Sequence, residues 1–186
     1  FRDNSALFEA GGCYLEDSSL ALMHGDFQGN SASLGGCFEL LNSTLTADNT
    51  DLSDSSSLQS GGFIHAVNSS VAARNTTLSR GTAGEGGAMW LTNSAFQAQR
   101  LQISDSRSLL DGGAIIGYGN STMLCSDCVL DNNIAGRRGG AISIEYNETQ
   151  RLAVQLTGST IRNNTAEYGG DHPFFHAVAE NLLATK

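Results

Sequence analysis

Apolar and polar residues alternate in short runs along the whole chain, and these runs recur at a nearly fixed spacing. Pairs of adjacent glycines accompany them, beginning at residues 11, 35, 61, 86, 112, 139 and 169. The intervals between the pairs are 24, 26, 25, 26, 27 and 30 residues. A unit of this length cannot bury its own apolar face, so the copies must stack on one another.

Three apolar columns emerge when the copies are aligned on their glycine pairs. The first column directly follows the glycines and includes Phe38, Ile64, Met89 and Ile142. The second column contains Leu20, Leu45, Val71, Phe96 and Met123. The third contains Phe27, Leu52, Leu78, Ile103, Leu130 and Ile161. Alternation with a period of two residues indicates β-strands, so each copy predicts three short strands joined by polar turns.

Stacking such copies predicts an all-β fold, a parallel β-helix over residues 1–170 with about seven coils of roughly 25 residues. Each strand would pair with its equivalent one coil away. A helical repeat of the ankyrin type is the competing interpretation, but the period-two alternation argues against it. Residues 171–186 leave the pattern and form either a further coil or a C-terminal cap, in which Pro173 would open a short helix.

Asparagines mark the bend after the third apolar column. Asn4, Asn30, Asn133 and Asn164 each lie three residues after the apolar residue, where other copies carry Ser or Gly. An Asn side chain tolerates a left-handed backbone and can bond to bend peptides or to the next Asn in a stack. We therefore predict a structural Asn ladder, with glycine pairs that supply a positive φ or allow close contact between coils.

Several short motifs resemble a known family. GGAM at 86–89, GGAI at 112–115 and 139–142, and FRDN and FQGN at 1–4 and 27–30 resemble the repeats of polymorphic outer-membrane and autotransporter-like surface proteins. The same pattern occurs in pectin-lyase-like proteins. The resemblance covers nearly all of residues 1–170 and implies a right-handed parallel β-helix with a role in surface display, adhesion or structure. The handedness follows from the resemblance alone.

The four cysteines fall into two pairs, and we take all four as candidate disulfide residues. Cys13 and Cys37 each follow a glycine pair, so stacking would bring their Cα atoms to about 4.8 Å, which suits either a disulfide or two packed thiols. Cys125 and Cys128 form a CxxC between the second and third predicted strands. A bend-closing disulfide is favoured there over free thiols or a redox or metal pair, because no second CxxC or His pair completes a zinc site. We expect no metal site.

Six Asn-x-Ser/Thr signals suggest a secreted glycoprotein: Asn42, Asn68, Asn75, Asn120, Asn147 and Asn163. Turn chemistry is the alternative explanation for Asn42, Asn68 and Asn120, which share one bend column with Asp17 and Asn93. An even number of cysteines together with these signals predicts an extracellular or cell-surface location.

The charge balance limits the possible partners. The chain has 19 acidic and 10 basic residues and a formal net charge of −9, which disfavours nucleic acid and anionic membranes. No apolar run has the 18 residues that a membrane-spanning helix requires. The chain begins at Phe1 inside a repeat, so we expect a segment of a larger rod or filament. Its partners would be other segments of the parent chain or neighbouring subunits, with carbohydrate as a further candidate.

The outward positions of the first strand show no catalytic pair. One row contains Glu39, His65, Trp90, Ile116 and Ser143, and the next contains Leu41, Val67, Thr92, Tyr118 and Glu145. Neither row places two acids on neighbouring coils, as glycoside hydrolysis would require, so we predict no catalytic residues and no cofactor.

Trp90 and Tyr118 are expected to be exposed on adjacent coils. There they would bind a sugar ring or a partner protein, or merely cover their neighbours. Taken together, the sequence predicts a structural or adhesive module. The alternative is a carbohydrate-binding or carbohydrate-active domain of the pectin-lyase-like type.

Overall fold

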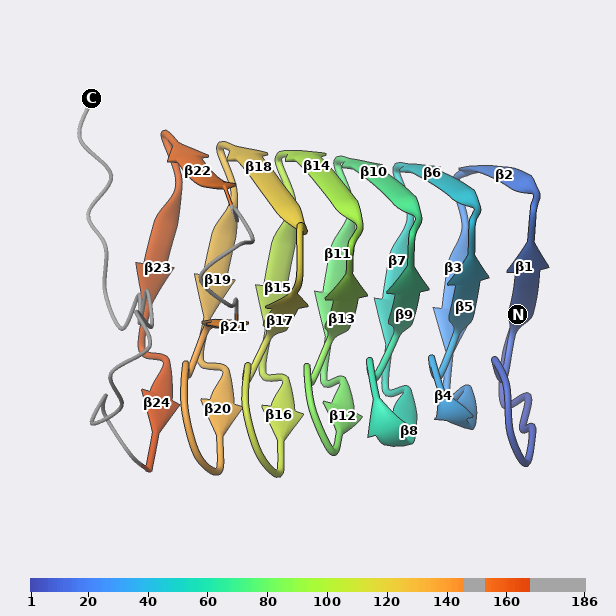
Figure 1. Cartoon of the computed structure of the whole chain (residues 1–186), viewed down its shortest axis with the longest axis horizontal. Helices are drawn as coiled ribbons and strands as arrows, with labels where there is room; N and C mark the ends of the chain where they lie inside the picture. Colours follow the sequence, from blue (N-terminus) through green and yellow to red (C-terminus); the bar gives the residue numbers. More distant parts are fainter. Residues whose placement is uncertain (146–152, 168–186) are drawn as a thin grey trace.

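The computed structural model describes residues 1–145 and 153–167, which form a parallel β-solenoid (Figure 1). Four sheets of six strands run along its axis, and every strand pair is parallel. Five turns therefore separate the first and last strands of each sheet. Equivalent residues are about 26 positions apart, as in Leu52 and Leu78. The predicted stacked all-β repeat is confirmed, but three strands per coil is wrong, because each coil has four.

The first two sheets contain the strands that follow the glycine pairs and the strands that come next in the chain. The first sheet consists of β1 (Cys13–Glu16), β5 (Phe38–Leu41), β9 (Ile64–Val67), β13 (Met89–Thr92), β17 (Ile115–Tyr118) and β21 (Ile142–Glu145). The second consists of β2 (Ser19–Met23), β6 (Thr44–Asp48), β10 (Ser70–Arg74), β14 (Ala95–Gln99), β18 (Thr122–Ser126) and β22 (Ala153–Thr157).

The other two sheets are built mostly from strands of two or three residues. The third sheet consists of β3 (Asp26–Gln28), β7 (Asp51–Ser53), β11 (Thr77–Ser79), β15 (Gln102–Ser104), β19 (Val129–Asp131) and β23 (Thr160–Arg162). The fourth consists of β4 (Ser31–Leu34), β8 (Ser56–Ser60), β12 (Thr82–Ala83), β16 (Arg107–Ser108), β20 (Ile134–Ala135) and β24 (Thr165–Ala166). Four of the six strands in the fourth sheet have only two residues, which is too short for an alternation to be detected, so the sequence did not reveal this sheet.

The core consists of side chains stacked in register along the axis. Phe38, Ile64, Met89, Ile115 and Ile142 are successive partners in the first sheet, and all five are at most 5% exposed. The third sheet contributes a second buried column: Phe27, Leu52, Leu78, Ile103, Leu130 and Ile161. These predicted columns are confirmed, and they form one continuous hydrophobic core.

The two glycines of a pair have different roles, as Gly61 and Gly62 illustrate. Gly61 has a φ of +68°, which disfavours any residue with a Cβ. Gly62 lies against the following coil, and a Cβ there would be 2.1 Å from the carbonyl oxygen of Gly87. Both expected functions of the glycine pairs are thus present, one at each position.

The predicted seven coils and the C-terminal segment are only partly covered by the structure. The seventh glycine pair, at 169, and the expected cap or further coil at 171–186 lie outside the described residues. The same holds for the glycosylation candidate Asn147.

Candidate functional site

A column of serines closes the bend between the first and second sheets. Ser18, Ser43, Ser69, Ser94 and Ser121 each donate a hydrogen bond from Oγ to a nearby carbonyl of their own coil, at 2.6–2.8 Å. Each Oγ from Ser43 onward also accepts the backbone N–H of the preceding serine in the column, at 3.0–3.3 Å. These bonds satisfy bend groups that the strand ladders leave free. Sequence reasoning missed this column, although the serine spacing was visible.

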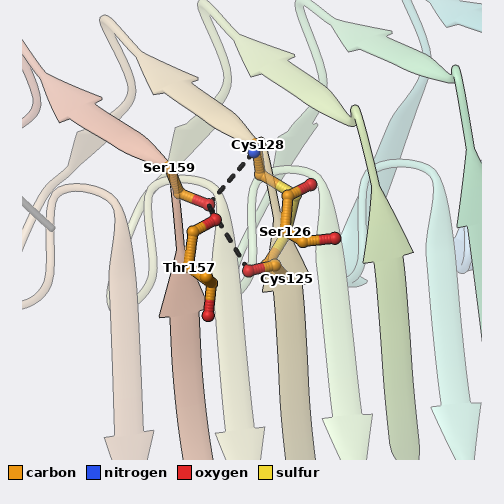
Figure 2. Close-up of a disulfide and its surroundings, with 5 residues drawn as sticks. All are labelled: Cys125, Ser126, Cys128, Thr157 and Ser159. Atoms are coloured by element: carbon orange, nitrogen blue, oxygen red, sulfur yellow. Dashed lines mark hydrogen bonds between the residues drawn. A yellow bond between two sulfur atoms is a disulfide. The ribbon is translucent and has the colours of Figure 1, made fainter. Parts of the chain in front are cut away.

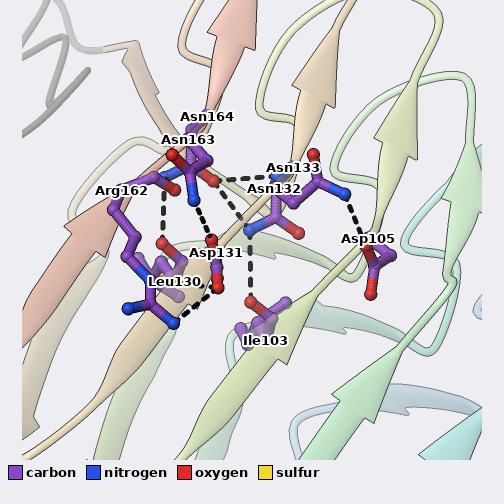
Figure 3. A network of polar contacts seen from close by, with 9 residues as sticks. All are labelled: Ile103, Asp105, Leu130, Asp131, Asn132, Asn133, Arg162, Asn163 and Asn164. Atoms are coloured by element: carbon purple, nitrogen blue, oxygen red, sulfur yellow. Dashed lines mark hydrogen bonds and ion pairs between the residues drawn. The ribbon is translucent and has the colours of Figure 1, made fainter.

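The four Asn residues predicted to form a ladder lie at the bend between the third and fourth sheets. Figure 3 shows two of them, Asn133 and Asn164. Asn4 Nδ2 donates to Asn30 Oδ1 at 2.9 Å, and Asn133 Nδ2 donates to Asn164 Oδ1 at 2.9 Å. Ser55, Gly81 and Ser106 occupy the coils between the two pairs, and Ser106 N donates to Asn133 Oδ1 at 3.0 Å. The structure therefore has two short Asn stacks bridged by smaller residues.

The expectation that these Asn residues adopt the left-handed backbone is wrong. Positive φ occurs one residue earlier in each coil: Asp3, Gly29, Asp54, Arg80, Asp105, Asn132 and Asn163. This placement turns the exposed preceding side chain away from the core and lets the following Asn point inward. Asn133 is fully buried as a result.

Replacing Asn133 with Ala should destabilise the fold by about 2–4 kcal/mol, because it removes three buried side-chain hydrogen bonds. These are the bond from Ser106 N, the bond to Ile103 O and the bond to Asn164 Oδ1, which keeps only the bond from the backbone N–H of residue 133. Urea unfolding followed by circular dichroism measures this loss. Asn132→Gly is the control, since Asn132 is exposed and glycine tolerates its φ of +56°, so this variant should lose far less stability. Equal losses for the two variants would show that the buried amide is not structural.

Cys125 and Cys128 form a disulfide across the bend between the second and third sheets (Figure 2). Their Cα atoms are 6.0 Å apart, and both residues are at most 5% exposed. Cys125 stacks on Ala98, and Cys128 N donates to Ser159 Oγ at 3.0 Å. The disulfide therefore lies in an inward position beside the core. Redox-active CxxC pairs lie instead at the start of a helix.

The predicted disulfide between Cys13 and Cys37 is absent, because both cysteines are free thiols. The sheet register explains the error: Cys13 pairs with Phe38, one residue beyond Cys37. Gly11, the first glycine of its pair, lies against Gly36, the second glycine of the next pair. The pair at 11 and 12 is therefore displaced by one position relative to the pair at 35 and 36. Cys37 is buried instead beside Ser55 Oγ, at 3.2 Å.

The two free thiols should react very differently with iodoacetamide at pH 8. Burial raises the pKa of Cys37 to about 11, so only about one molecule in a thousand carries the reactive thiolate. Cys13 is partly exposed, so we expect it to be alkylated first. Peptide mass spectrometry measures both sites, with urea-unfolded protein as the fully reactive control. Equal native rates, or a peptide linking Cys13 to Cys37, would contradict the observed register.

The outward row of the first sheet is more buried than its position suggested. Glu39 and His65 are 4% and 6% exposed, and His65 Nδ1 lies 3.5 Å from Glu39 Oε1. The first glycine of several pairs lies against this face. A Cβ on Gly112, for example, would be 2.9 Å from Ile116 Cβ, and one on Gly139 would be 2.8 Å from Ser143 Cβ. The face is therefore an outer packing layer, where an open binding surface had been expected.

Trp90 and Tyr118 are both partly buried, so the expectation that they are exposed is wrong. The His65 ring stacks on Trp90 with centroids 4.4 Å apart, and the Tyr118 ring lies 5.4 Å from Trp90 on its other side. Trp90 Nε1 and Tyr118 OH both donate to Glu85 Oε2, at 3.4 and 2.9 Å. Neighbours thus contact the Trp90 ring from both directions, which does not favour stacking on a sugar.

Charged groups surround these aromatic rings. Arg137 Nε donates to Asp111 Oδ1 at 2.9 Å, with a second contact between Arg137 Nη2 and Asp111 Oδ2, and Asp111 is fully buried. Burial raises the pKa of Tyr118, and the hydrogen bond to Glu85 adds to the effect. Burial is also the main reason why the pKa of Glu145 is raised, and the negative charge of Asp111 raises it further. The Arg137–Asp111 pair joins the segments that precede two successive glycine pairs, and Arg138 Nη1 lies 3.8 Å from Glu145 Oε1 at the end of β21.

The glycosylation candidates differ in their surroundings. Asn42 and Asn68 are exposed at the first bend, both with a φ of +50°. The sequence predicted that Asn120 shares their bend position, but this is wrong, because Gly119 occupies it with a φ of +66°. The amide groups of Asn75 and Asn163 donate to Asp48 and Asp131, at 3.3 and 2.9 Å.

An open groove of about 480 Å³ crosses the outer face of the second sheet. Thr46, Asp48, Arg74, Gln97 and Gln99 contribute polar side chains to it. Ala72 leaves space between the larger side chains on either side of it. The groove presents hydrogen-bond donors and acceptors on a rigid sheet.

The fold defines the chain as a parallel β-solenoid. One stretch of 60 residues, 32% of the chain, is 40% identical to the probable autotransporter YfaL of Escherichia coli strain K12. The chain spans about 5% of the length of that protein. No family model and no solved structure matches the chain. Among the described residues, no helix has the length and hydrophobicity needed to cross a membrane.

Proposed function

We propose that this chain is a rigid structural or adhesive module of a larger protein displayed outside the cell or on its surface. The observation that carries the proposal is the continuous parallel stacking of all four sheets, with one register shift between β4 and β8, which makes the described segment a stiff spacer. The similarity to a probable autotransporter supports a location at the cell surface. The right-handed winding implied by the family resemblance is part of this proposal.

The same proposal includes glycosylation and the absence of enzymatic activity. We expect glycans first at Asn42 and Asn68, whose side chains are exposed at a bend. Asn75 and Asn163 are poorer acceptors, since their amides are hydrogen-bonded to carboxylates. Mass spectrometry of native material tests this order. We expect no cofactor, and other segments of the parent chain as the immediate partners.

Antibodies against the folded chain, applied to intact cells of the producing organism, test the surface location. We expect labelling before permeabilisation and its loss after brief protease treatment of intact cells. An antibody against a cytoplasmic protein serves as the control for cell integrity. Labelling that requires permeabilisation would contradict surface display.

Carbohydrate binding is the second candidate function, and the groove on the second sheet favours it. Its amides, hydroxyls and Arg74 match the hydrogen-bonding groups of a glycan better than they match an apolar ligand. A glycan array probed with the wild type and with Arg74→Ala and Gln97→Ala tests this possibility. Incubation with acidic polysaccharides tests for activity. Product formation abolished by one carboxylate substitution would favour an enzyme over a module.

A further inference from the structure

Exposed leucines lie along one edge of the solenoid, beside the fourth sheet. Leu7, Leu58 and Leu109 are 84%, 80% and 74% exposed. Leu58 is in β8 and Leu109 directly follows β16, and both strands have neighbours on either side in the fourth sheet. The exposure of these two side chains is therefore a property of the edge itself and does not depend on where the described stack begins or ends. Large apolar side chains that gather in this way mark an interaction surface.

The leucines alternate with small residues along this edge. In successive coils, the fourth sheet is paired at Ser5, Ser31, Ser56, Thr82, Arg107 and Ile134. The residues two positions further along the chain are Leu7, Ser33, Leu58, Gly84, Leu109 and Gly136. A leucine thus protrudes on every second coil, about 9.6 Å from the next one. Gly84 and Gly136 have no side chain, and Ser33 is only 8% exposed because Gln59 Nε2 donates to its hydroxyl at 2.7 Å.

This alternation makes the edge complementary to itself when two copies run antiparallel. In a parallel two-fold pair each coil meets its own equivalent, so leucine would meet leucine. In an antiparallel pair, the coil of Leu58 can lie opposite the coil of Gly84, which places every leucine opposite a small residue. The three contacts would be Leu58 with Gly84, Leu109 with Ser33 and Leu7 with Gly136. Protruding side chains would then pack into positions that carry none, as close packing requires.

Charges at the edge favour the same arrangement. Glu9 is exposed two residues after Leu7, and Arg137 directly follows Gly136. The Arg137 side chain is 40% exposed although it pairs with Asp111, so a partner can still reach it. With Leu7 opposite Gly136, Glu9 of each copy would face Arg137 of the other. A parallel pair would bring the two Glu9 carboxylates together instead, and like charges at an interface are unfavourable.

We propose that the leucine edge, formed by Leu7, Leu58 and Leu109, binds the same edge of a second copy of this chain in an antiparallel dimer. The inference goes beyond the proposed structural role and does not depend on it. The contact uses the same surface of both copies and closes on itself, so it builds a dimer without further growth. The contact would extend over about 24 Å, from the coil of Leu7 to that of Gly136, which is small for a protein interface and predicts weak association.

Sedimentation velocity of the full chain at concentrations up to about 1 mM tests the proposal. We expect a monomer–dimer equilibrium with no larger species. Leu58→Lys should weaken dimerisation about tenfold or more, because the dimer would cover two ammonium groups that are free in the monomer. Met23→Lys is the matched control, since Met23 is 73% exposed at the end of β2, on another face. Circular dichroism shows whether both variants fold, and Leu109→Lys replaces Leu58→Lys if that variant does not.

Spin labels distinguish the two possible orientations. A label on Thr165→Cys, in a Cys13→Ser background, lies on an exposed position of the fourth sheet three coils beyond Thr82. In the antiparallel dimer the two labels would be about 34 Å apart along the axis, whereas a parallel dimer would place them side by side. Electron paramagnetic resonance measures this distance, and adjacent labels would overturn the proposal.

Two results of the sedimentation experiment would also overturn it. A monomer at every concentration would leave the leucine edge to another segment of the parent protein or to a different partner. Equal weakening by Leu58→Lys and Met23→Lys would show that association does not use this edge. Surface labelling by antibody does not depend on dimerisation, so failure here is distinguishable from failure of the proposed function.

Discussion

Replacing Ile115 with Asp should leave no folded protein under conditions in which the wild type is stable. Ile115 is 1% exposed and stacks between Met89 and Ile142 in the middle of the first sheet. A carboxylate there would be buried among apolar side chains without a partner, at a cost of about 4 kcal/mol or more. That loss is a large fraction of the stability of an ordinary domain.

Thermal unfolding followed by circular dichroism measures this effect. Gln97→Asp is the control, because Gln97 is exposed on the outer face of β14. It should change stability by less than about 0.5 kcal/mol. Identical melting curves for the two variants would mean that Ile115 does not belong to the core column.

Replacing Gly87 with Ala should strongly destabilise the fold, although it adds only one methyl group. The added Cβ would lie 2.2 Å from Gly113 O and 2.7 Å from Arg107 N, both of them backbone atoms of the next coil. A backbone neighbour cannot rotate away as a side chain would, so the two coils must separate. We expect a loss of about 3 kcal/mol or more.

Urea unfolding gives the magnitude, and hydrogen exchange gives the location. The amide of Gly87 donates to Gly112 O at 3.0 Å, and this bond should exchange faster in the variant if the variant folds. Ser70→Ala, on an exposed face of β10, adds no atom between coils and should behave like the wild type. Full stability of Gly87→Ala would show that the coils are not in contact at the glycine column.

The sequence identified the parts of the fold that depend on long-range repetition of large apolar side chains. Ile64, Met89 and Ile142 were placed in one column from their distance to the glycine pairs, and the sheet register confirms it. Period-two alternation is a robust signal because burial of one face imposes it. The fourth sheet carries no such signal, since Ala83 and Ser108 are small residues in strands of two.

The errors at the candidate sites arose from local shifts of one residue. Cys13 aligned with Cys37 by the glycine pairs, yet the hydrogen-bonded register pairs it with Phe38. Asn120 aligned with Asn68, yet Gly119 occupies the left-handed position. When the length of a repeat varies, the sequence alone does not reveal which turn contains the extra residue, because any of the turns can accommodate it at a low cost in free energy.

Burial of the outward row could not be read from alternation either. Alternation separates the two faces of a strand, but it does not reveal that a later segment folds back over the outer one. His65 and Trp90 are covered in this way, beside turns in which the first glycine of the pair, such as Gly61 or Gly86, has a positive φ. The stacked rings of His65 and Trp90 therefore belong to a packing layer that only the three-dimensional structure reveals.

Engineered disulfides between coils test the stacking register most directly. Thr46 and Ala72 are register partners on the outer face of the second sheet, so cysteines at these positions would have Cα atoms about 4.8 Å apart. Cysteines at Thr46 and Ser70 lie on the same face but two residues out of register, about 8 Å apart, which is too far for a disulfide. Mild oxidation followed by peptide mass spectrometry should show rapid bonding of the first pair only. Bonding of the second pair in preference to the first would contradict the stacked register.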